Sequence, residues 1–176
     1  MYENTDELLR EIAAGEDTLL EFKEVLFRGD QPRFANVEGR AQRRISEVFV
    51  SMANTEGGVV LFGVNDRREV VGIDEARRHD LEQWVVNCAR DLCEPRGSIE
   101  PRIDWRYLPD QAGNRLLVLK VDIPKSRFYV HQTSDGRFLK RVGSHIGIIP
   151  GDQLGRMLAE KQLSIPFEER PCPGTS

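Results

Sequence analysis

Cations and aromatic side chains alternate along one stretch near the end of the chain. Residues 125–131 read Lys-Ser-Arg-Phe-Tyr-Val-His, and more basic residues follow as far as position 141. Arginine and lysine bind phosphate, and aromatic rings stack on exposed bases. The pattern therefore predicts a nucleic-acid surface that includes Arg127, Tyr129, Lys140, Arg141 and Ser144. The alternative interpretation places Phe128 or Tyr129 in the core and leaves the cations as a solvated rim.

A second basic group begins a predicted helix. It consists of Arg40, Arg43 and Arg44, and the amides of a helix N-terminus also favour anions. We expect this group to join the first one, together with Lys23 and Arg67, on one basic face. Separate, solvated charges are the alternative. The net charge of -4 and the pI of about 5.5 argue mildly against a protein that simply coats nucleic acid.

Other reactive chemistry finds little support. His79, His131 and His145 lack zinc-ligand spacing, and the sequence contains no GxxxxGK[ST] phosphate loop. The three cysteines form no disulfide pattern, which favours free thiols and a cytoplasmic location. No apolar run approaches the length needed to span a membrane.

The elements that must position these residues indicate an α+β protein with a mixed sheet flanked by helices. Apolar periodicity predicts helices over 3–14, 38–53, 75–93 and 151–162, and strands over 18–25, 59–64, 99–108 and 116–123. Residues 26–37 lack a clean period and are expected to form a polar, mobile loop. We predict an N-terminal helix in 1–15, one domain over 16–163 and a loose tail over 164–176.

The most informative segment runs from the end of the second helix into an apolar strand. The strand 59–64 shows no alternation, so both of its faces should be covered. Asn54, Gly57 and Gly58 can adopt the left-handed conformations that end a helix and reverse the chain. In the strand 116–123, Lys120 and Asp122 are expected to point outward, away from the apolar side chains.

Three motifs in the right order resemble the Schlafen/AlbA-like domain family. The central motif matches at Ala53, Asn54, Thr55, Gly57, Gly58, Gly63, Val64 and Asp66. Upstream, Glu16 is followed five positions later by Glu21-Phe22-Lys23, and downstream lies Arg141-Val142-Gly143-Ser144. The resemblance implies an AlbA-like α+β fold over about 16–158, nucleic-acid binding with little sequence specificity, a regulatory role and a homodimer.

The same resemblance implies a second function. Some animal relatives are metal-dependent RNases, whose metal-binding acids correspond here to Glu16, Glu21 and Asp66. Three carboxylates could bind Mg²⁺ or Mn²⁺ and activate water. The alternative is structural: Lys23 lies on the same strand face as Glu21 and could simply pair with it, and Asp66 could cap a turn. A binding domain without a cofactor is our main prediction; a nuclease and a protein-interaction module are the alternatives.

Overall fold

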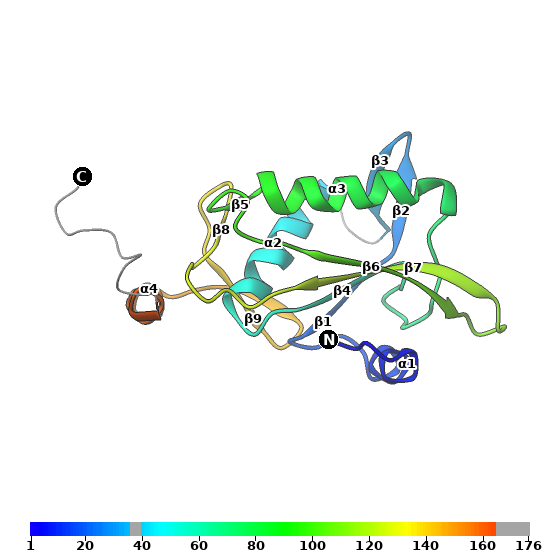
Figure 1. Ribbon diagram of the computed structural model, residues 1–176, viewed down its shortest axis with the longest axis horizontal. Helices are drawn as coiled ribbons and strands as arrows, with labels where there is room; N and C mark the ends of the chain where they lie inside the picture. The colour runs from blue at the N-terminus through cyan, green and yellow to red at the C-terminus, as the bar shows by residue number, and fades with distance from the viewer. Residues whose placement is uncertain (36–39, 165–176) are drawn as a thin grey trace.

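The fold is built on a central sheet of four strands. The computed structural model describes residues 1–35 and 40–164 of the 176-residue chain (Figure 1). The sheet order is β1–β4–β7–β6, and the strands are β1 (Leu20–Lys23), β4 (Gly58–Phe62), β7 (Arg115–Ile123) and β6 (Arg102–Pro109). β1 runs parallel to β4, while β4–β7 and β7–β6 are antiparallel. The sheet is therefore mixed, and the predicted α+β class is confirmed.

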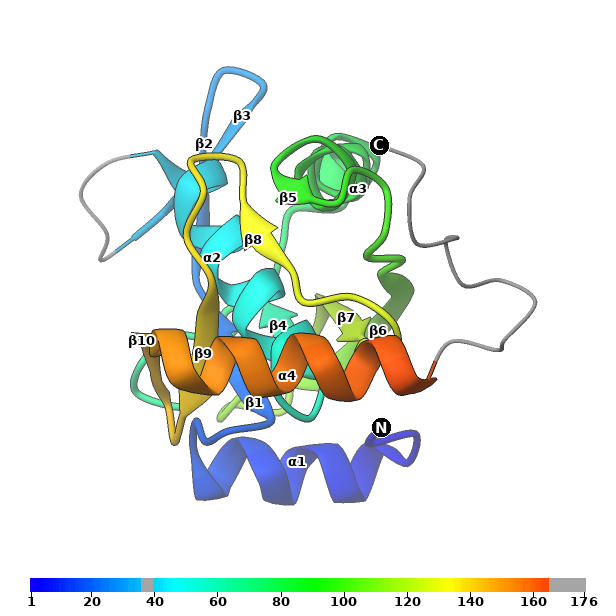
Figure 2. The same ribbon diagram turned by 90° about the vertical axis from the view of Figure 1, so that its left-hand side faces the viewer.

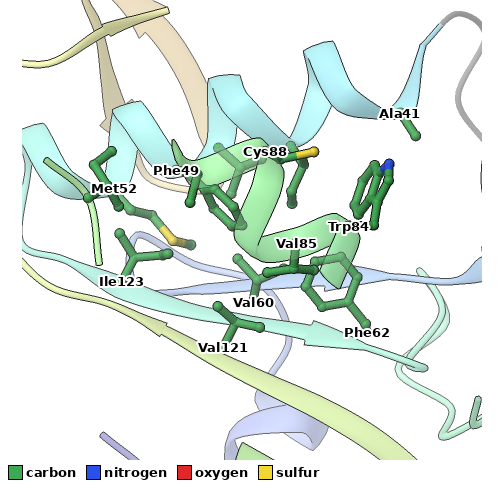
Figure 3. Close-up of a cluster of buried hydrophobic side chains, with 14 of the residues drawn as sticks. Ala41, Phe49, Met52, Val60, Phe62, Trp84, Val85, Cys88, Val121 and Ile123 are labelled. Atoms are coloured by element: carbon green, nitrogen blue, oxygen red, sulfur yellow. The ribbon is translucent and has the colours of Figure 1, made fainter. Parts of the chain in front are cut away.

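Helices cover both faces of this sheet. On one face lie α2 (Ala41–Asn54) and α3 (Arg78–Asp91), the latter preceded by the short 3-10 helix η1 (Glu75–Arg77). Figure 3 shows side chains of α2 and α3 packing on β4 and β7. On the other face, α1 (Thr5–Ala14) buries Leu8 and Ile12. Every residue of β4 is buried, as its uniformly apolar sequence predicts.

Three two-stranded pairs and a final helix complete the fold. The pairs are β2 (Val25–Arg28) with β3 (Gln31–Phe34), β5 (Cys93–Glu94) with β8 (Gln132–Thr133), and β9 (Leu139–Val142) with β10 (His145–Ile148). α4 (Gly151–Ser164) lies at one end of the molecule, beyond β9 (Figure 1). No helix in the described part of the chain is both long and apolar enough to cross a bilayer. The tail predicted after 164 lies outside the described residues.

The polar loop expected over 26–37 is wrong up to Phe34, and positions 36 and 37 lie outside the described residues. β2 and β3 instead form a hairpin, with Leu26 opposite Arg33 and Arg28 opposite Gln31. Val25 and Phe34 face the core, whereas the cross-strand set Leu26, Arg28, Gln31 and Arg33 faces solvent. Only a few residues alternate on each strand, and the Gly29-Asp30 turn interrupts them, so the period was too short to recognise.

Lys120 also differs from its predicted environment. It lies on the sheet face opposite Leu119, as expected, but that face is covered and its side chain is fully buried. Its ammonium group lies 2.7 Å from Asp122 Oδ2 and 4.0 Å from Asp104 Oδ2. A charge at this depth needs such partners because water cannot solvate it.

Candidate nucleic-acid interface

A buried glutamate holds three arginines at the first half of α2. The side chain of Glu47 is only 8% exposed. Its Oε2 lies 3.0 Å from Arg44 Nη1, and its Oε1 lies 2.9 Å from Arg137 Nη2 and 3.4 Å from Arg43 Nε. The spacing explains two of these contacts, because positions three and four apart share one face of a helix. The third contact brings in a distant part of the chain.

Asp135 links the same group to the β8–β9 turn. Arg137 Nε lies 3.0 Å from its carboxylate, and Arg43 Nη2 lies 3.7 Å away. A hydrogen bond from the Thr133 hydroxyl, followed by those from Arg137, lowers the pKa of Asp135. The turn thus lies beside the start of α2 (Figure 2). We call Arg40, Arg43, Arg44 and Arg137 the arginine cluster.

The arginine cluster is held by a buried carboxylate but remains largely exposed to solvent. The side chains of Arg43 and Arg44 are 66% and 54% exposed although both contact Glu47. Arg40, at the N-cap of α2, is exposed as well. A guanidinium carries five N–H donors, so one or two contacts to Glu47 leave others for a ligand. The predicted grouping of Arg40, Arg43 and Arg44 at a helix start is therefore present, with Arg137 added.

The predicted aromatic segment is solvent-facing. Phe128 and Tyr129 are 40% and 49% exposed, and Arg127 beside them is exposed. The amide of Ser126 donates to the carbonyl of Ala53 (2.9 Å), which attaches this segment to the last turn of α2. The alternative in which one ring lies in the core is wrong. The arginine cluster and the aromatic segment lie at opposite ends of a 14-residue helix, about 20 Å long.

Two of the predicted phosphate-binding cations are largely covered instead, Arg141 fully and Lys23 with 12% of its side chain exposed. Arg141 has a side chain with no exposed surface, and its Nη1 lies 2.8 Å from Glu21 Oε2. Lys23 lies 2.5 Å from Glu21 Oε1 and over the ring of Phe34. Both cations form ion pairs with the same buried carboxylate, that of Glu21. The expectation that Lys23 and Arg141 contribute to a basic surface is therefore wrong. Lys23 pairs with Glu21, as the structural alternative states, whereas Arg141 pairs with a residue 120 positions away that no local pattern could reveal.

The remaining predicted cations do not all share one face. Arg67 pairs with Glu69 inside its own turn, and the neighbouring Arg68 donates to the carbonyl of Ala13 at the end of α1. That turn is therefore attached to the helix on the other side of the sheet from α2. Lys140 donates to Gln153 of α4 (2.7 Å), and Ser144 is exposed in the β9–β10 turn. The single basic face expected from the sequence is thus reduced to the arginine cluster and the aromatic segment.

The three acids of the nuclease alternative influence one another without forming a metal site. Glu16 accepts the amide of Phe22 (2.6 Å). Its pKa is raised, first by desolvation and next by the charge of Glu21, with a smaller contribution from Asp66. Asp66 is exposed in the turn after β4. Among the described residues, no group of three or more His, Cys, Asp or Glu side chains is arranged to hold a metal ion.

The chemistry of Glu21 explains why. Each of its two oxygens already contacts a cation, Lys23 or Arg141. A divalent ion would have to displace one of these, although both are held by further contacts: Arg141 Nη2 also donates to the carbonyl of Asp17 (2.6 Å). The residues present therefore fit an ion-pair network, not a Mg²⁺ or Mn²⁺ centre.

The central motif ties distant backbone segments together. The Asn54 side chain donates to the carbonyls of His131 and Leu139 and accepts the amide of His131, at 2.7–2.9 Å. The Thr55 hydroxyl accepts the amide of Arg141 (2.9 Å). These bonds attach the β8 and β9 region to the end of α2. Asn54 does this from within the helix, so the expectation that it adopts a left-handed, helix-ending conformation is wrong.

The glycines of the motif lie where the backbone has positive φ or where neighbouring atoms leave no room for a Cβ. Gly57 has φ of 75°, and a Cβ there would lie 2.7 Å from the carbonyl oxygen of Ile123. At Gly63, φ is 109°. Gly58 lies in β4 with an ordinary φ, but a Cβ would meet the Met52 sulfur at 2.7 Å. The predicted chain reversal therefore depends on Gly57, while Gly58 is required by its neighbours.

These ties place the three sequence motifs at one junction of β1, β9 and the end of α2. A family model described as Schlafen, AlbA_2 matches residues 16–149. The chain belongs to this family. The Schlafen AlbA_2 signature includes, in this member, a buried ion pair, a side-chain amide bridge and close-packed glycines, so much of it specifies the fold.

One solved structure shows the same fold at greater length. The crystal structure of the DIP2311 protein from Corynebacterium diphtheriae matches with a TM-score of 0.54 and 16% identity. The match covers 85% of this chain but 25% of that protein, so the chain spans about a quarter of its structural relative. A search among curated proteins found no match. At this identity the likeness supports the fold alone.

Sequence reasoning missed the residues that hold the cluster in place. Glu47 follows Arg43 by four positions and Arg44 by three, which is a helical ion-pair spacing that could have identified it. Asp135 carried no such signal, because its contact with Arg43 joins segments far apart in the sequence. The hairpin β2–β3, with Arg28 and Arg33 on its solvent face, was likewise hidden in the expected loop.

Proposed function

We propose that this domain binds nucleic acid, with little sequence specificity, through the arginine cluster. The observation that carries the proposal is the buried carboxylate of Glu47, which holds the exposed Arg43 and Arg44 together with the 30% exposed Arg137. Exposed arginines usually lose side-chain entropy when they bind a ligand. Arginines that are already held lose less, so their contacts to phosphate contribute more to the affinity.

The local positive charge of the arginine cluster favours an anionic ligand, although the chain as a whole carries a net negative charge. Three arginines, Arg43, Arg44 and Arg137, contact two carboxylates, Glu47 and Asp135, and the exposed Arg40 adds a fourth positive charge at the start of α2. The guanidinium fork matches the geometry of a phosphate group and can bind it through two parallel hydrogen bonds. The overall charge of -4 opposes non-specific coating. A confined contact with a short stretch of phosphates fits both facts.

The aromatic segment supplies a second kind of contact. Arg127 with Phe128 and Tyr129 presents a cation next to two exposed rings at the other end of α2. Rings of this kind stack on unpaired bases and contribute roughly 1–3 kcal/mol per base, with little dependence on base identity. This arrangement favours single-stranded or structured RNA or DNA over a regular duplex.

Fluorescence anisotropy tests the proposal. Labelled single- and double-stranded RNA and DNA are titrated with the whole chain at two salt concentrations. About four arginine–phosphate contacts on a single strand predict a slope of log affinity against log salt near roughly -3. Arg43→Ala combined with Arg44→Ala should weaken binding at least tenfold.

The control is matched in charge. Arg10→Ala with Arg115→Ala removes two exposed arginines that lie outside the cluster, and this variant should bind like the wild type. Equal losses in both double variants would reduce the effect to net charge and contradict the proposed site. Absence of binding to all four nucleic acids would leave the protein-interaction alternative as the better account.

A further inference from the structure

A pocket opens beside the arginine cluster, between the β2–β3 hairpin, the first turn of α2 and α3. Its volume is about 420 Å³, within the range of sites that accept small organic ligands. Trp84, Cys88 and Leu92 supply its apolar lining. The rest of the lining is polar and consists of four carboxamides, three carboxylates and His79.

Carboxamides dominate that polar lining. Gln31, Gln42, Gln83 and Asn87 all face the pocket. Gln83 Nε2 donates to Asn87 Oδ1 (3.0 Å), which leaves one carbonyl oxygen and one amino group of this pair for a ligand. Side chains that both donate and accept suit the edge of a nucleobase, which presents donors and acceptors side by side.

Two of the three carboxylates of the pocket are paired with arginines. Asp91 contacts Arg90 and Arg96, each at 2.7 Å, and these contacts keep the pKa of Asp91 well below its usual range. Asp80 pairs with Arg77 at 3.3 Å. Asp30 accepts a hydrogen bond from Gln31 at 3.2 Å. The pocket therefore offers mainly neutral hydrogen-bonding groups over an apolar floor. Its charge is too far compensated to select a cation.

The pocket and the cluster share the first turn of α2. Gln42 lines the pocket, and the next residue, Arg43, belongs to the cluster. One helical position turns the side chain by about 100°, so the two residues face adjacent sides of the same turn. A phosphate bound by Arg43 would thus lie on the side of α2 next to the one that lines the pocket.

We propose that this pocket receives one unpaired nucleobase of the strand whose phosphates bind the arginine cluster. The inference rests on the proposed function and adds to it a binding site for one unpaired base. The carboxamides bind the edge of the base, and the apolar floor around Trp84 receives its face. A duplex cannot supply this contact unless a base leaves the stack, which costs a few kcal/mol.

The test compares a single-stranded RNA of about ten nucleotides, a length within the range of single-strand binding sites, with an abasic chain of equal length and charge. The wild type should bind the RNA about tenfold more tightly than the abasic chain. Gln83→Ala with Asn87→Ala should reduce this difference to the part that stacking on Phe128 and Tyr129 supplies, and should leave the abasic affinity unchanged. The control, Gln111→Ala with Gln162→Ala, removes two exposed carboxamides elsewhere and should behave like the wild type.

A second readout reports on the pocket itself. The chain has two tryptophans, so Trp105→Phe leaves Trp84 as the fluorophore. The RNA should quench this fluorescence, and the abasic chain should not. Equal affinity for both chains, or an unchanged preference in the Gln83–Asn87 variant, overturns this inference while the arginine cluster stands. If neither the RNA nor the abasic chain binds, both the proposed function and the pocket proposal are overturned.

Discussion

Arg141 and Glu21 form a buried ion pair, with Arg141 Nη1 2.8 Å from Glu21 Oε2, that joins β9 to β1 across 120 residues of sequence. Lys23 contacts the other oxygen of Glu21 at 2.5 Å. Arg141 Nε is buried and has no hydrogen-bond partner among the described residues. The pair therefore carries a desolvation cost that its contacts only partly offset, and it is sensitive to loss of either member.

Arg141→Met should lower the free energy of unfolding by about 3 kcal/mol. The substitution keeps the length of the side chain but leaves one oxygen of the buried Glu21 carboxylate without its cation. Urea unfolding measures the change. Arg127→Met, at an exposed position, is the matched control and should stay within about 0.5 kcal/mol of the wild type. A loss at Arg141 as small as that at Arg127 would mean that the pair contributes nothing to stability.

Asn54→Ala should destabilise the domain by about 3 kcal/mol, because it removes three buried hydrogen bonds and leaves backbone groups of His131 and Leu139 unsatisfied. Hydrogen exchange should show faster exchange of the His131 amide in particular. Ser144→Ala, in an exposed turn, is the control. Unchanged protection of His131 in Asn54→Ala would contradict the bridging role of this side chain.

His131 makes stability depend on pH. Burial, and then the charge of Lys161, lowers its pKa to about 4, below the value near 6.5 of an unfolded histidine. Between these values the unfolded chain binds a proton that the folded chain does not. Stability should therefore be unaffected above about pH 6.5 and fall as the pH decreases toward 4, by an amount of order 3 kcal/mol.

Urea unfolding of the wild type and of His131→Gln at pH 7, 5.5 and 4.5 isolates this contribution. The decrease in stability with falling pH should be smaller in His131→Gln. His145→Gln changes an exposed histidine and should leave the pH dependence as in the wild type. Parallel curves for the wild type and His131→Gln would show that His131 is protonated in the folded protein as readily as in the unfolded one.

Much of the fold could be predicted because its signals are local. The apolar face of α2 and the unbroken run of β4 each lie within one short window of sequence, and both elements formed close to their predicted bounds. Very short elements were not recognisable, because they contain too few residues to show a period. The β2–β3 hairpin has four residues per strand, too few to distinguish alternation from a loop.

The candidate site was predictable only in part, because burial of a charge depends on partners that are distant in the sequence. Arg43 and Arg141 look alike as letters among basic neighbours. Arg43 contacts the buried Glu47 and its side chain stays exposed, whereas Arg141 contacts Glu21 and is fully buried. The spacing of Arg43 and Glu47 indicates a local partner, but no pattern along the chain shows which of the two arginines is exposed. The pocket beside α2 escaped for the same reason, since its lining comes from three separate elements.

Nucleic-acid binding should not require a divalent metal, because both oxygens of Glu21 are already engaged by cations. We expect the dissociation constant measured by anisotropy to change less than about twofold on addition of EDTA at constant ionic strength, apart from the screening that Mg²⁺ itself supplies. Glu21→Gln should lower stability, since it leaves Lys23 and Arg141 buried without a carboxylate. It should not weaken binding at a temperature where the variant is folded.

The nuclease alternative makes opposite predictions for removal of the metal and for Glu21→Gln. It requires cleavage of RNA that depends on Mn²⁺ or Mg²⁺ and disappears in a folded Glu21→Gln protein. Such a result would mean that the ion displaces Lys23 or Arg141 from Glu21 and recruits Glu16, whose pKa is raised first by burial and next by the charge of Glu21. Glu56→Gln, an exposed acid paired with Lys125, controls for general loss of negative charge.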